Sequence, residues 1–101
     1  MACKVVITDE AARSRDDIVA YLVAVLCEPK AAGRFLDELD ALADRLAEFP
    51  EAYPVSSESR LAEMGYRKTR IMRYIVLYKV KADTVYITNI FHETQDYAKL
   101  V

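Results

Sequence analysis

The chain has 101 residues, a length that accommodates one domain and not two. Hydrophobic residues make up 53% of it and charged residues 30%, and only two Gly and three Pro are present, which excludes collagen-like, low-complexity and disordered classes. The net charge of −2 argues against a uniformly basic nucleic-acid-binding protein, and no apolar run approaches the roughly 20 residues that span a bilayer. We therefore expect a single domain over residues 1–101, cytoplasmic and without membrane association, with Cys3 and Cys27 reduced.

The first half of the chain predicts a strand followed by two helices. Residues 3–7 are rich in β-branched side chains and predict a short strand, after which Thr8 or Asp9 can cap a helix. This helix extends to about residue 26 and ends before Pro29, and a second helix is expected over residues 30–49. The short break between them predicts an antiparallel helical hairpin. The apolar stripes at helical spacing are Ala11, Ile18, Tyr21, Leu22, Val25 and Leu26 in the first helix, and Phe35, Leu36, Leu39, Leu42, Ala43, Leu46 and Phe49 in the second.

From Tyr66 onward the apolar period changes to two, which indicates strands. We predict strands over residues 66–72, 74–81 and 84–91, the last two joined by a tight hairpin. The middle strand is apolar on both sides and should lie centrally in the sheet. The segments around these strands are expected to be an irregular stretch over 55–65 with one helical turn near Leu61, and a short helix or tail over 94–100. The predicted fold is α+β in the order β-α-α-β-β-β, with a small, mainly antiparallel sheet packed against the helical hairpin.

Charge is distributed unevenly along the chain. Residues 1–65 hold seven Lys/Arg against thirteen Asp/Glu, whereas residues 66–101 hold seven Lys/Arg against three Asp/Glu. Such asymmetry favours an anionic partner, although a sheet edge made basic to discourage aggregation would have the same composition. The acid-free stretch 66–81 contains Arg67, Lys68, Arg70, Arg73, Lys79 and Lys81.

The only histidine, His92, is the candidate for acid–base chemistry near neutral pH. Tyr97 follows it and could stack on a base or assist proton transfer. Metal-independent RNA cleavage needs a general base, an acid and cations around one phosphate, and the basic residues of 66–73 could supply the cations. Whether they lie beside His92 is open, because a one-residue slip of a strand turns its side chains to the other face. The structural alternatives are a His that caps the next segment and a Tyr that packs the tail against the sheet.

The usual motifs of cofactor and metal chemistry are absent from the sequence. Two glycines cannot build a phosphate-binding loop, there is no HExxH or GxSxG motif, and the cysteines have no zinc-ligand spacing. We therefore expect no cofactor and no metal.

The order and spacing of these segments resemble the RelE/ParE superfamily, the small toxins of bacterial type II toxin–antitoxin modules, also called plasmid stabilisation proteins. The resemblance extends over nearly the whole chain. It is strongest in the strand pair 66–70 and 74–80, which is followed by 85–92 and 95–97. In the helices the matching residues are Ala11, Asp17, Ile18 and Tyr21, the segment 29–36 and the segment 46–50.

The resemblance implies a toxin that a cognate antitoxin keeps inactive by covering or distorting its working surface. RelE-like members cut messenger RNA on the ribosome, whereas ParE-like members poison DNA gyrase and have no established catalytic residues. We place the ribosome-dependent endoribonuclease slightly first, because His92 and Tyr97 have a role in it. The alternatives are a non-enzymatic gyrase inhibitor and a decayed toxin that only binds its antitoxin.

In the ribonuclease interpretation, each candidate residue has a role. His92 would be the general acid or base, and Tyr97 would stack or assist proton transfer. The phosphate would be stabilised by Lys68, Arg70 and Arg73, and further RNA or target contacts would come from Arg67, Lys79 and Lys81. Two departures from the ribonuclease pattern count against it, since the central strand begins without a basic residue and Glu93-Thr94 stand where many ribonuclease members carry arginines.

Overall fold

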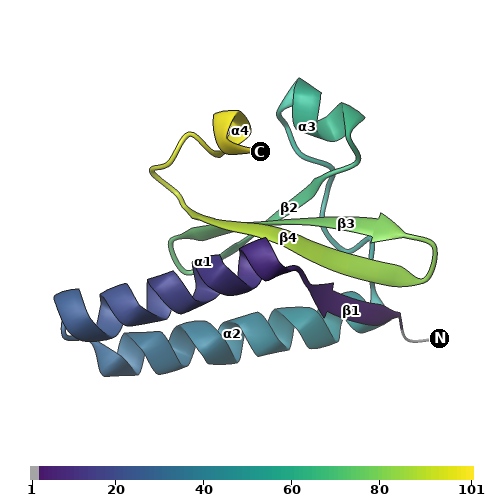
Figure 1. Cartoon of the computed structure of the whole chain (residues 1–101). Coiled ribbons are helices and arrows are strands. Elements are labelled where there is room, and N and C mark those ends of the chain that lie inside the picture. Colours follow the sequence, from purple (N-terminus) through teal and green to yellow (C-terminus); the bar gives the residue numbers. More distant parts are fainter. Residues whose placement is uncertain (1–2) are drawn as a thin grey trace.

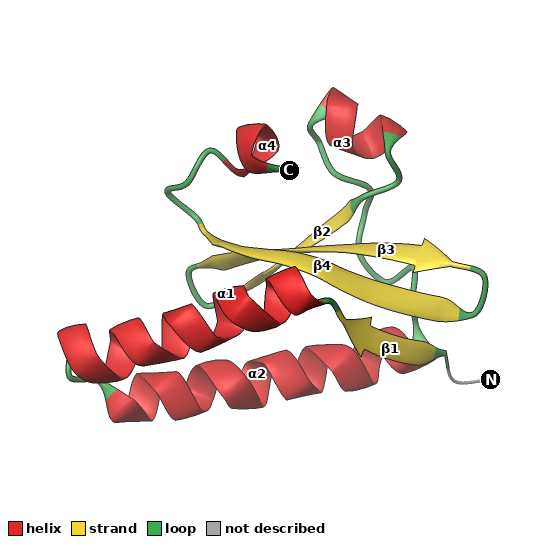
Figure 2. Cartoon of the chain, viewed as in Figure 1, coloured by secondary structure: helices red, strands yellow, loops and turns green. Residues whose placement is uncertain are grey.

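A four-stranded sheet forms the middle of the molecule, with a helical hairpin on one face and two short helices on the other (Figure 1). The computed structural model describes residues 3–101. The order of helices and strands confirms the predicted α+β fold (Figure 2). The elements are β1 (Lys4–Ile7), α1 (Asp9–Ala20) with a π-helical extension (Tyr21–Val25), α2 (Pro29–Glu48), α3 (Ser59–Glu63), β2 (Arg67–Ile71), β3 (Tyr74–Lys81), β4 (Thr84–His92) and α4 (Tyr97–Leu100).

The strands lie in the order β1-β4-β3-β2. Strands β2, β3 and β4 form an antiparallel meander, and β1 pairs with β4 in parallel at the far edge. Strand β3 is therefore central, as its two apolar sides predicted. The helical hairpin connects β1 to the meander and covers the sheet face that we call the hairpin face; the opposite face is called the outer face (Figure 1).

A β-bulge in β4 determines which side chains point to which face. Leu77 pairs with Asn89 and the next residue, Tyr78, pairs with Ile87, so Thr88 has no residue opposite it on β3. An extra residue in one strand reverses the alternation of side chains beyond it. The bulge thus places Val85 and Ile87 on the hairpin face before it and Ile90 on the same face after it, where all three are buried.

Two apolar clusters hold the layers together, one on each face of the sheet. On the hairpin face, Phe35 of α2 is fully buried and meets the ring of Tyr74 edge-on at 5.0 Å between centroids. On the outer face, Leu61 of α3 packs with buried Leu77 of β3. The hairpin-face cluster also contains Ala11, Leu22, Ala32, Leu39, Leu42, Leu46, Ile71, Val76, Tyr78, Val85, Ile87 and Ile90, and the outer cluster contains Tyr66 and Ile75, with Phe91, Tyr97 and Val101 against it.

The first helix begins as predicted but ends differently. Thr8 is its N-cap, with its hydroxyl accepting a hydrogen bond from the Ala11 N–H at 3.3 Å. After Ala20 the helix widens into a π-helical turn, in which the Leu26 N–H donates to the Tyr21 carbonyl at 3.1 Å. From this turn onward three side chains of the predicted stripe are exposed, a correction to the buried face that the helical spacing indicated: Tyr21, Val25 and Leu26.

The second helix follows the prediction closely. Four of its five buried residues, Phe35, Leu39, Leu42 and Leu46, come from the predicted stripe, and the fifth is Ala32. Two residues of the predicted stripe are exposed, which corrects the prediction: Leu36, at the edge of the buried face, and Phe49, just beyond the helix end. No helix within residues 3–101 combines the length and apolar character that crossing a membrane requires.

Candidate functional site

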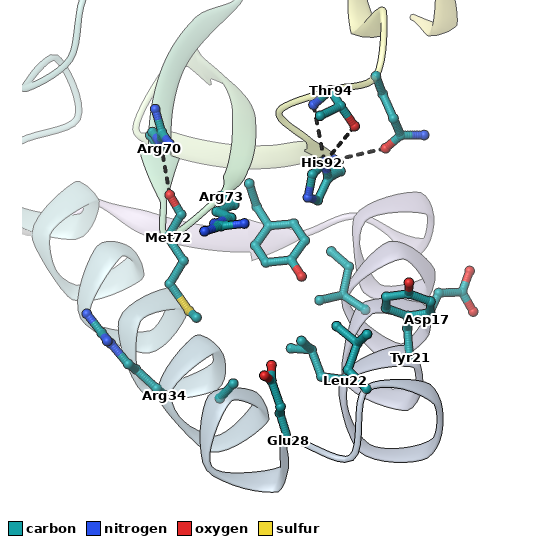
Figure 3. A pocket seen from close by; sticks show the side chains of 15 residues that line it. Asp17, Tyr21, Leu22, Glu28, Arg34, Arg70, Met72, Arg73, His92 and Thr94 are labelled. Carbon is teal, nitrogen blue, oxygen red and sulfur yellow. Dashed lines mark hydrogen bonds between the residues drawn. The ribbon is translucent and has the colours of Figure 1, made fainter.

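A cleft of about 1220 Å³ opens between the tip of the helical hairpin and the end of the sheet. Figure 3 shows its walls, which are the end of α1 and the start of α2 on one side, and the β2–β3 turn and the end of β4 on the other. We call it the hairpin cleft. Its apolar lining consists of Ile18, Tyr21, Leu22, Leu26, Ala31, Met72 and Tyr74.

Charged side chains of both signs surround this apolar lining. Arg34 is 3.8 Å from Glu38 on its own helix, and Arg70 pairs with Glu93 and donates to the Met72 carbonyl at 2.8 Å. Arg73 forms no ion pair with any described residue, and it is exposed at the rim. The acidic residues of the cleft are Asp17 and Glu28.

His92 lies at the cleft with one ring nitrogen already engaged. Its Nδ1 is 2.8 Å from the Thr94 hydroxyl and accepts a hydrogen bond from the Thr94 N–H at 3.2 Å. In the neutral ring the proton is therefore on Nε2, and the ring stands edge-on to Tyr74 at 5.5 Å between centroids. The backbone N–H of His92 donates to Gln95 Oε1 at 2.8 Å. These contacts order the turn after β4. They fit the alternative to a catalytic role that the sequence left open, in which His92 caps the segment that follows the strand.

Tyr74, which forms part of the cleft floor, is a neutral phenol at physiological pH. Burial raises its pKa above 10.0, the nearby Tyr21 and Glu28 add to the increase, and the Arg73 guanidinium acts in the opposite direction. The cleft floor therefore supplies a hydrogen-bonding hydroxyl and an aromatic face rather than a base.

Lys68 and Tyr97 meet on the outer face, away from the cleft. The Lys68 Nζ is 3.1 Å from the Tyr97 hydroxyl and 5.6 Å from the centre of its ring. Tyr97 also stacks on Phe91 at 6.3 Å between centroids. Since Tyr97 begins α4, these contacts hold the C-terminal segment against the sheet.

The five residues that the sequence suggested for catalysis are thus divided between two faces. His92 and Arg73 line the cleft, whereas Lys68 and Tyr97 lie on the outer face. Arg70 pairs with Ile75, which places it on the outer face, and its long side chain reaches round to the cleft rim. The structure does not bring His92 together with Lys68.

The three further target-binding candidates are also placed separately. Arg67 donates to the Tyr53 carbonyl at 2.7 Å. The Lys79 Nζ lies 4.2 Å above the centre of the Tyr66 ring, and Lys81 is exposed beside the β3–β4 turn. Among residues 3–101 no group of three His, Cys, Asp or Glu side chains could hold a metal ion.

Sequence reasoning missed the tip of the helical hairpin as part of a site. Tyr21 and Leu26 were placed in a buried stripe, yet they form an exposed apolar rim. The break at Glu28-Pro29 was the feature of the sequence that could have indicated this exposed rim, because a short hairpin connection leaves the helix ends without cover.

A family model described as the ParE toxin of the type II toxin–antitoxin system parDE matches residues 5–97. The chain belongs to the ParE toxin family. This family membership confirms the RelE/ParE resemblance, makes the chain the toxin of a type II pair and implies a cognate antitoxin as its partner.

The ParE fold is also found in a solved structure similar to this chain. A chain described as the chromosomal ParDE toxin–antitoxin system from P. aeruginosa superimposes with a TM-score of 0.65 at 18% sequence identity. The match covers 90% of this chain and 96% of that one. A search of curated proteins finds no significant match.

Proposed function

We propose that this ParE-family toxin acts by binding DNA gyrase, without catalysis of its own, and that its antitoxin neutralises it by occupying the hairpin cleft. Membership of the ParE family supports the gyrase alternative over the ribonuclease that sequence reasoning placed first. Cytoplasmic action follows from this target. The proposal has two parts, the target and the antitoxin site, and each has its own support and its own test.

The observation that carries the first part is the separation of His92 from Lys68 by the sheet. Lys68 pairs with Leu77 on the outer face, whereas His92 pairs with Tyr74, which faces the hairpin. Acid–base cleavage of RNA requires the proton-transfer group and the cations within hydrogen-bond reach of one phosphate. The sheet separates His92 from Lys68 and Tyr97, and only Arg70 and Arg73 of the predicted cations reach the cleft where His92 lies, so the predicted catalytic group is incomplete there. A toxin that works by contact does not require such a group.

The target is tested with purified gyrase and by expression of the chain alone. We expect growth arrest with intact transcripts, and inhibition of DNA supercoiling in vitro that is the same for the wild type and His92→Ala. Cleavage inside translated codons that disappears in His92→Ala would restore the ribonuclease. If the chain causes neither growth arrest nor inhibition of gyrase, it is a decayed toxin.

The second part is supported by the composition of the hairpin cleft. Leu22 and Tyr74 form a buried apolar floor, Tyr21 and Leu26 add exposed apolar surface, and Arg73 contributes a cation without a carboxylate partner among the described residues. An amphipathic segment with an acidic residue matches this arrangement, because its apolar side would cover the floor and its carboxylate would pair with Arg73.

The antitoxin site is tested with a pair of aspartate substitutions in one turn. Leu26 lines the cleft, whereas Val25, its neighbour in sequence, is more exposed and lies outside the cleft. We expect Leu26→Asp to weaken the affinity for the antitoxin by about tenfold to a hundredfold, the usual range for an interface anchor, and Val25→Asp to leave it within about twofold. Equal effects of both substitutions on the affinity measured by calorimetry would contradict the assignment.

A further inference from the structure

The helical hairpin and the strands of the sheet carry opposite charges. Helices α1 and α2 contain nine Asp/Glu and five Lys/Arg, whereas the four described strands contain six Lys/Arg and no acidic residue. The uneven charge along the sequence thus corresponds to a difference between the helices of the hairpin and the strands. Five of the six strand cations point to the outer face by their register: Lys4, Lys68, Arg70, Lys79 and Lys81.

Four of these residues form a diagonal series across the sheet, which we call the lysine band: Lys4, Lys68, Lys79 and Lys81. Lys4 and Lys81 both pair with Thr84, so they stand two strands apart, at about 10 Å. Lys79 and Lys81 are neighbours on one face of β3, at about 7 Å. Lys68 lies diagonally from Lys79 on the adjacent strand, at about 7–8 Å. The band thus carries four positive charges about 7–10 Å apart, with Lys4 and Lys81 exposed and Lys68 and Lys79 half-buried.

The charges of the lysine band are not neutralised within the molecule. None of the four lysines forms an ion pair with a described carboxylate, in contrast to Arg70, which is paired with Glu93. Lys68 donates to the Tyr97 hydroxyl and Lys79 lies over the Tyr66 ring, and both contacts are with neutral groups. Asp83, in the turn that follows Lys81, is the acidic residue beside the band in sequence, and it leaves an excess of positive charge.

We propose that the lysine band binds the phosphate backbone of duplex DNA. A protein partner would need an exposed apolar centre, and the large exposed hydrophobic residues lie on other parts of the chain, none of them on β1, β3 or β4. A row of cations on a pleated surface suffices for a polyanion, since phosphate contacts are electrostatic and independent of sequence.

Duplex rather than single-stranded nucleic acid fits this surface. Binding of single strands relies on exposed aromatic rings on which bases stack. Here Tyr66 is buried beneath Lys79, and Tyr97 is already stacked on Phe91. Tyr86, opposite Lys79, is half-buried, and one partly covered ring does not provide the series of stacking platforms that a single strand uses. The choice of DNA over RNA rests on the proposed function, because gyrase would bring the toxin to DNA.

The test is binding of the full chain to a fluorescent 20-base-pair duplex, followed by anisotropy between 50 and 200 mM salt. Neutralisation of about four phosphates predicts that log K falls with log salt with a slope of about −3.6. In the double variant Lys79→Gln/Lys81→Gln we expect binding at 50 mM salt to weaken by about tenfold or more, and the slope to fall to about −1.8. The matched control is Arg13→Gln/Lys30→Gln, which removes the same charge from exposed positions of α1 and α2 and should change binding by less than about threefold.

Three results would overturn the proposal: no binding of the wild type at 50 mM salt, an equal loss of binding in the control, or tighter binding of an RNA duplex. A loss of antitoxin affinity in the Lys79→Gln/Lys81→Gln variant, without DNA binding by the wild type, would assign the band to the antitoxin instead. Gyrase is absent from this measurement, so a failure of DNA binding and a failure of gyrase inhibition are distinguishable.

Discussion

Lys68 and His92 lie on opposite faces of the same sheet, Lys68 against Tyr97 and His92 against Tyr74. The sequence had suggested that both residues belong to one catalytic group. The bulge at Thr88 is the cause, because without it the alternation along β4 would turn His92 to the outer face, where Lys68 and Tyr97 are. One unpaired residue therefore changes which chemistry the sheet can support.

The contacts of Tyr97 give the first prediction, since a packing role and a catalytic role differ in their response to substitution. Tyr97→Phe keeps the stack on Phe91 and loses the hydrogen bond from Lys68, so we expect a loss of about 0.5–1.5 kcal/mol in stability and unchanged toxicity. Tyr97→Ala should cost more, about 2–3 kcal/mol, because it also removes the ring from the outer cluster.

Urea unfolding measures both changes in stability, and hydrogen exchange of residues 97–100 reports the release of α4. Faster exchange in Tyr97→Ala than in Tyr97→Phe is the expected order. A Tyr97→Phe toxin that folds normally but no longer arrests growth would instead point to a chemical role of the hydroxyl.

The succession of helices and strands could be predicted from the sequence because each has a clear period. The spacing of Phe35, Leu39, Leu42 and Leu46 produces one buried stripe on α2, and the two apolar sides of β3 place it inside the sheet. The turn near Leu61 was also predicted, and Leu61 is fully buried. In these segments local pattern and tertiary burial agree.

The site was less predictable, because it depends on local departures from ideal periods. The bulge at Thr88 is an insertion in the pairing of β4, and no residue of this strand is a glycine that would mark it. Tyr21 and Leu26 continue the α-helical spacing in the sequence, yet both are exposed at the hairpin tip, where the helix ends in a π-helical turn. The charge asymmetry was visible in the sequence, but its division between two faces required the register.

The contact between helix and sheet gives a second prediction. Phe35 is completely buried and meets Tyr74 edge-on, whereas the next residue, Leu36, is 37% exposed. Phe35→Ala should lower the free energy of unfolding by about 3–5 kcal/mol, enough to leave much of a small domain unfolded, and Leu36→Ala by less than about 1 kcal/mol. Thermal unfolding followed by circular dichroism distinguishes these values, and similar losses in the two variants would contradict the assigned face of α2.

The β3–β4 connection gives a third prediction. Ala82 has a φ of 56°, a left-handed conformation that costs a residue with a Cβ about 1–2 kcal/mol and glycine almost nothing. We expect Ala82→Gly to stabilise the protein by up to about 1 kcal/mol after the greater entropy of the unfolded glycine is included. The matched control is Ala41→Gly on the exposed side of α2, which should destabilise by about 1 kcal/mol. Destabilisation by both substitutions would show that the turn does not retain this conformation in solution.

The buried tyrosines predict loss of stability at alkaline pH. Burial raises the pKa of both Tyr74 and Tyr78 above 10.0. A folded-state pKa above the unfolded value means that the protonated phenols stabilise the fold, fully below pH 10 and progressively less as the pH rises through the raised pKa values. The Tyr74→Phe/Tyr78→Phe variant cannot titrate at these positions, so its free energy of unfolding should fall less between about pH 9 and pH 11 than that of the wild type.

Tyr86→Phe is the matched control for this pH dependence, because Tyr86 is only half-buried and its substitution removes the same hydroxyl group. Urea unfolding at each pH gives the comparison. Lysine deprotonation above pH 10 acts on all three proteins alike, and the difference between the curves therefore isolates the phenols. Parallel curves for the wild type and the double variant would mean that the two hydroxyls keep the same proton affinity in the folded and unfolded chain, which is incompatible with their burial against α2.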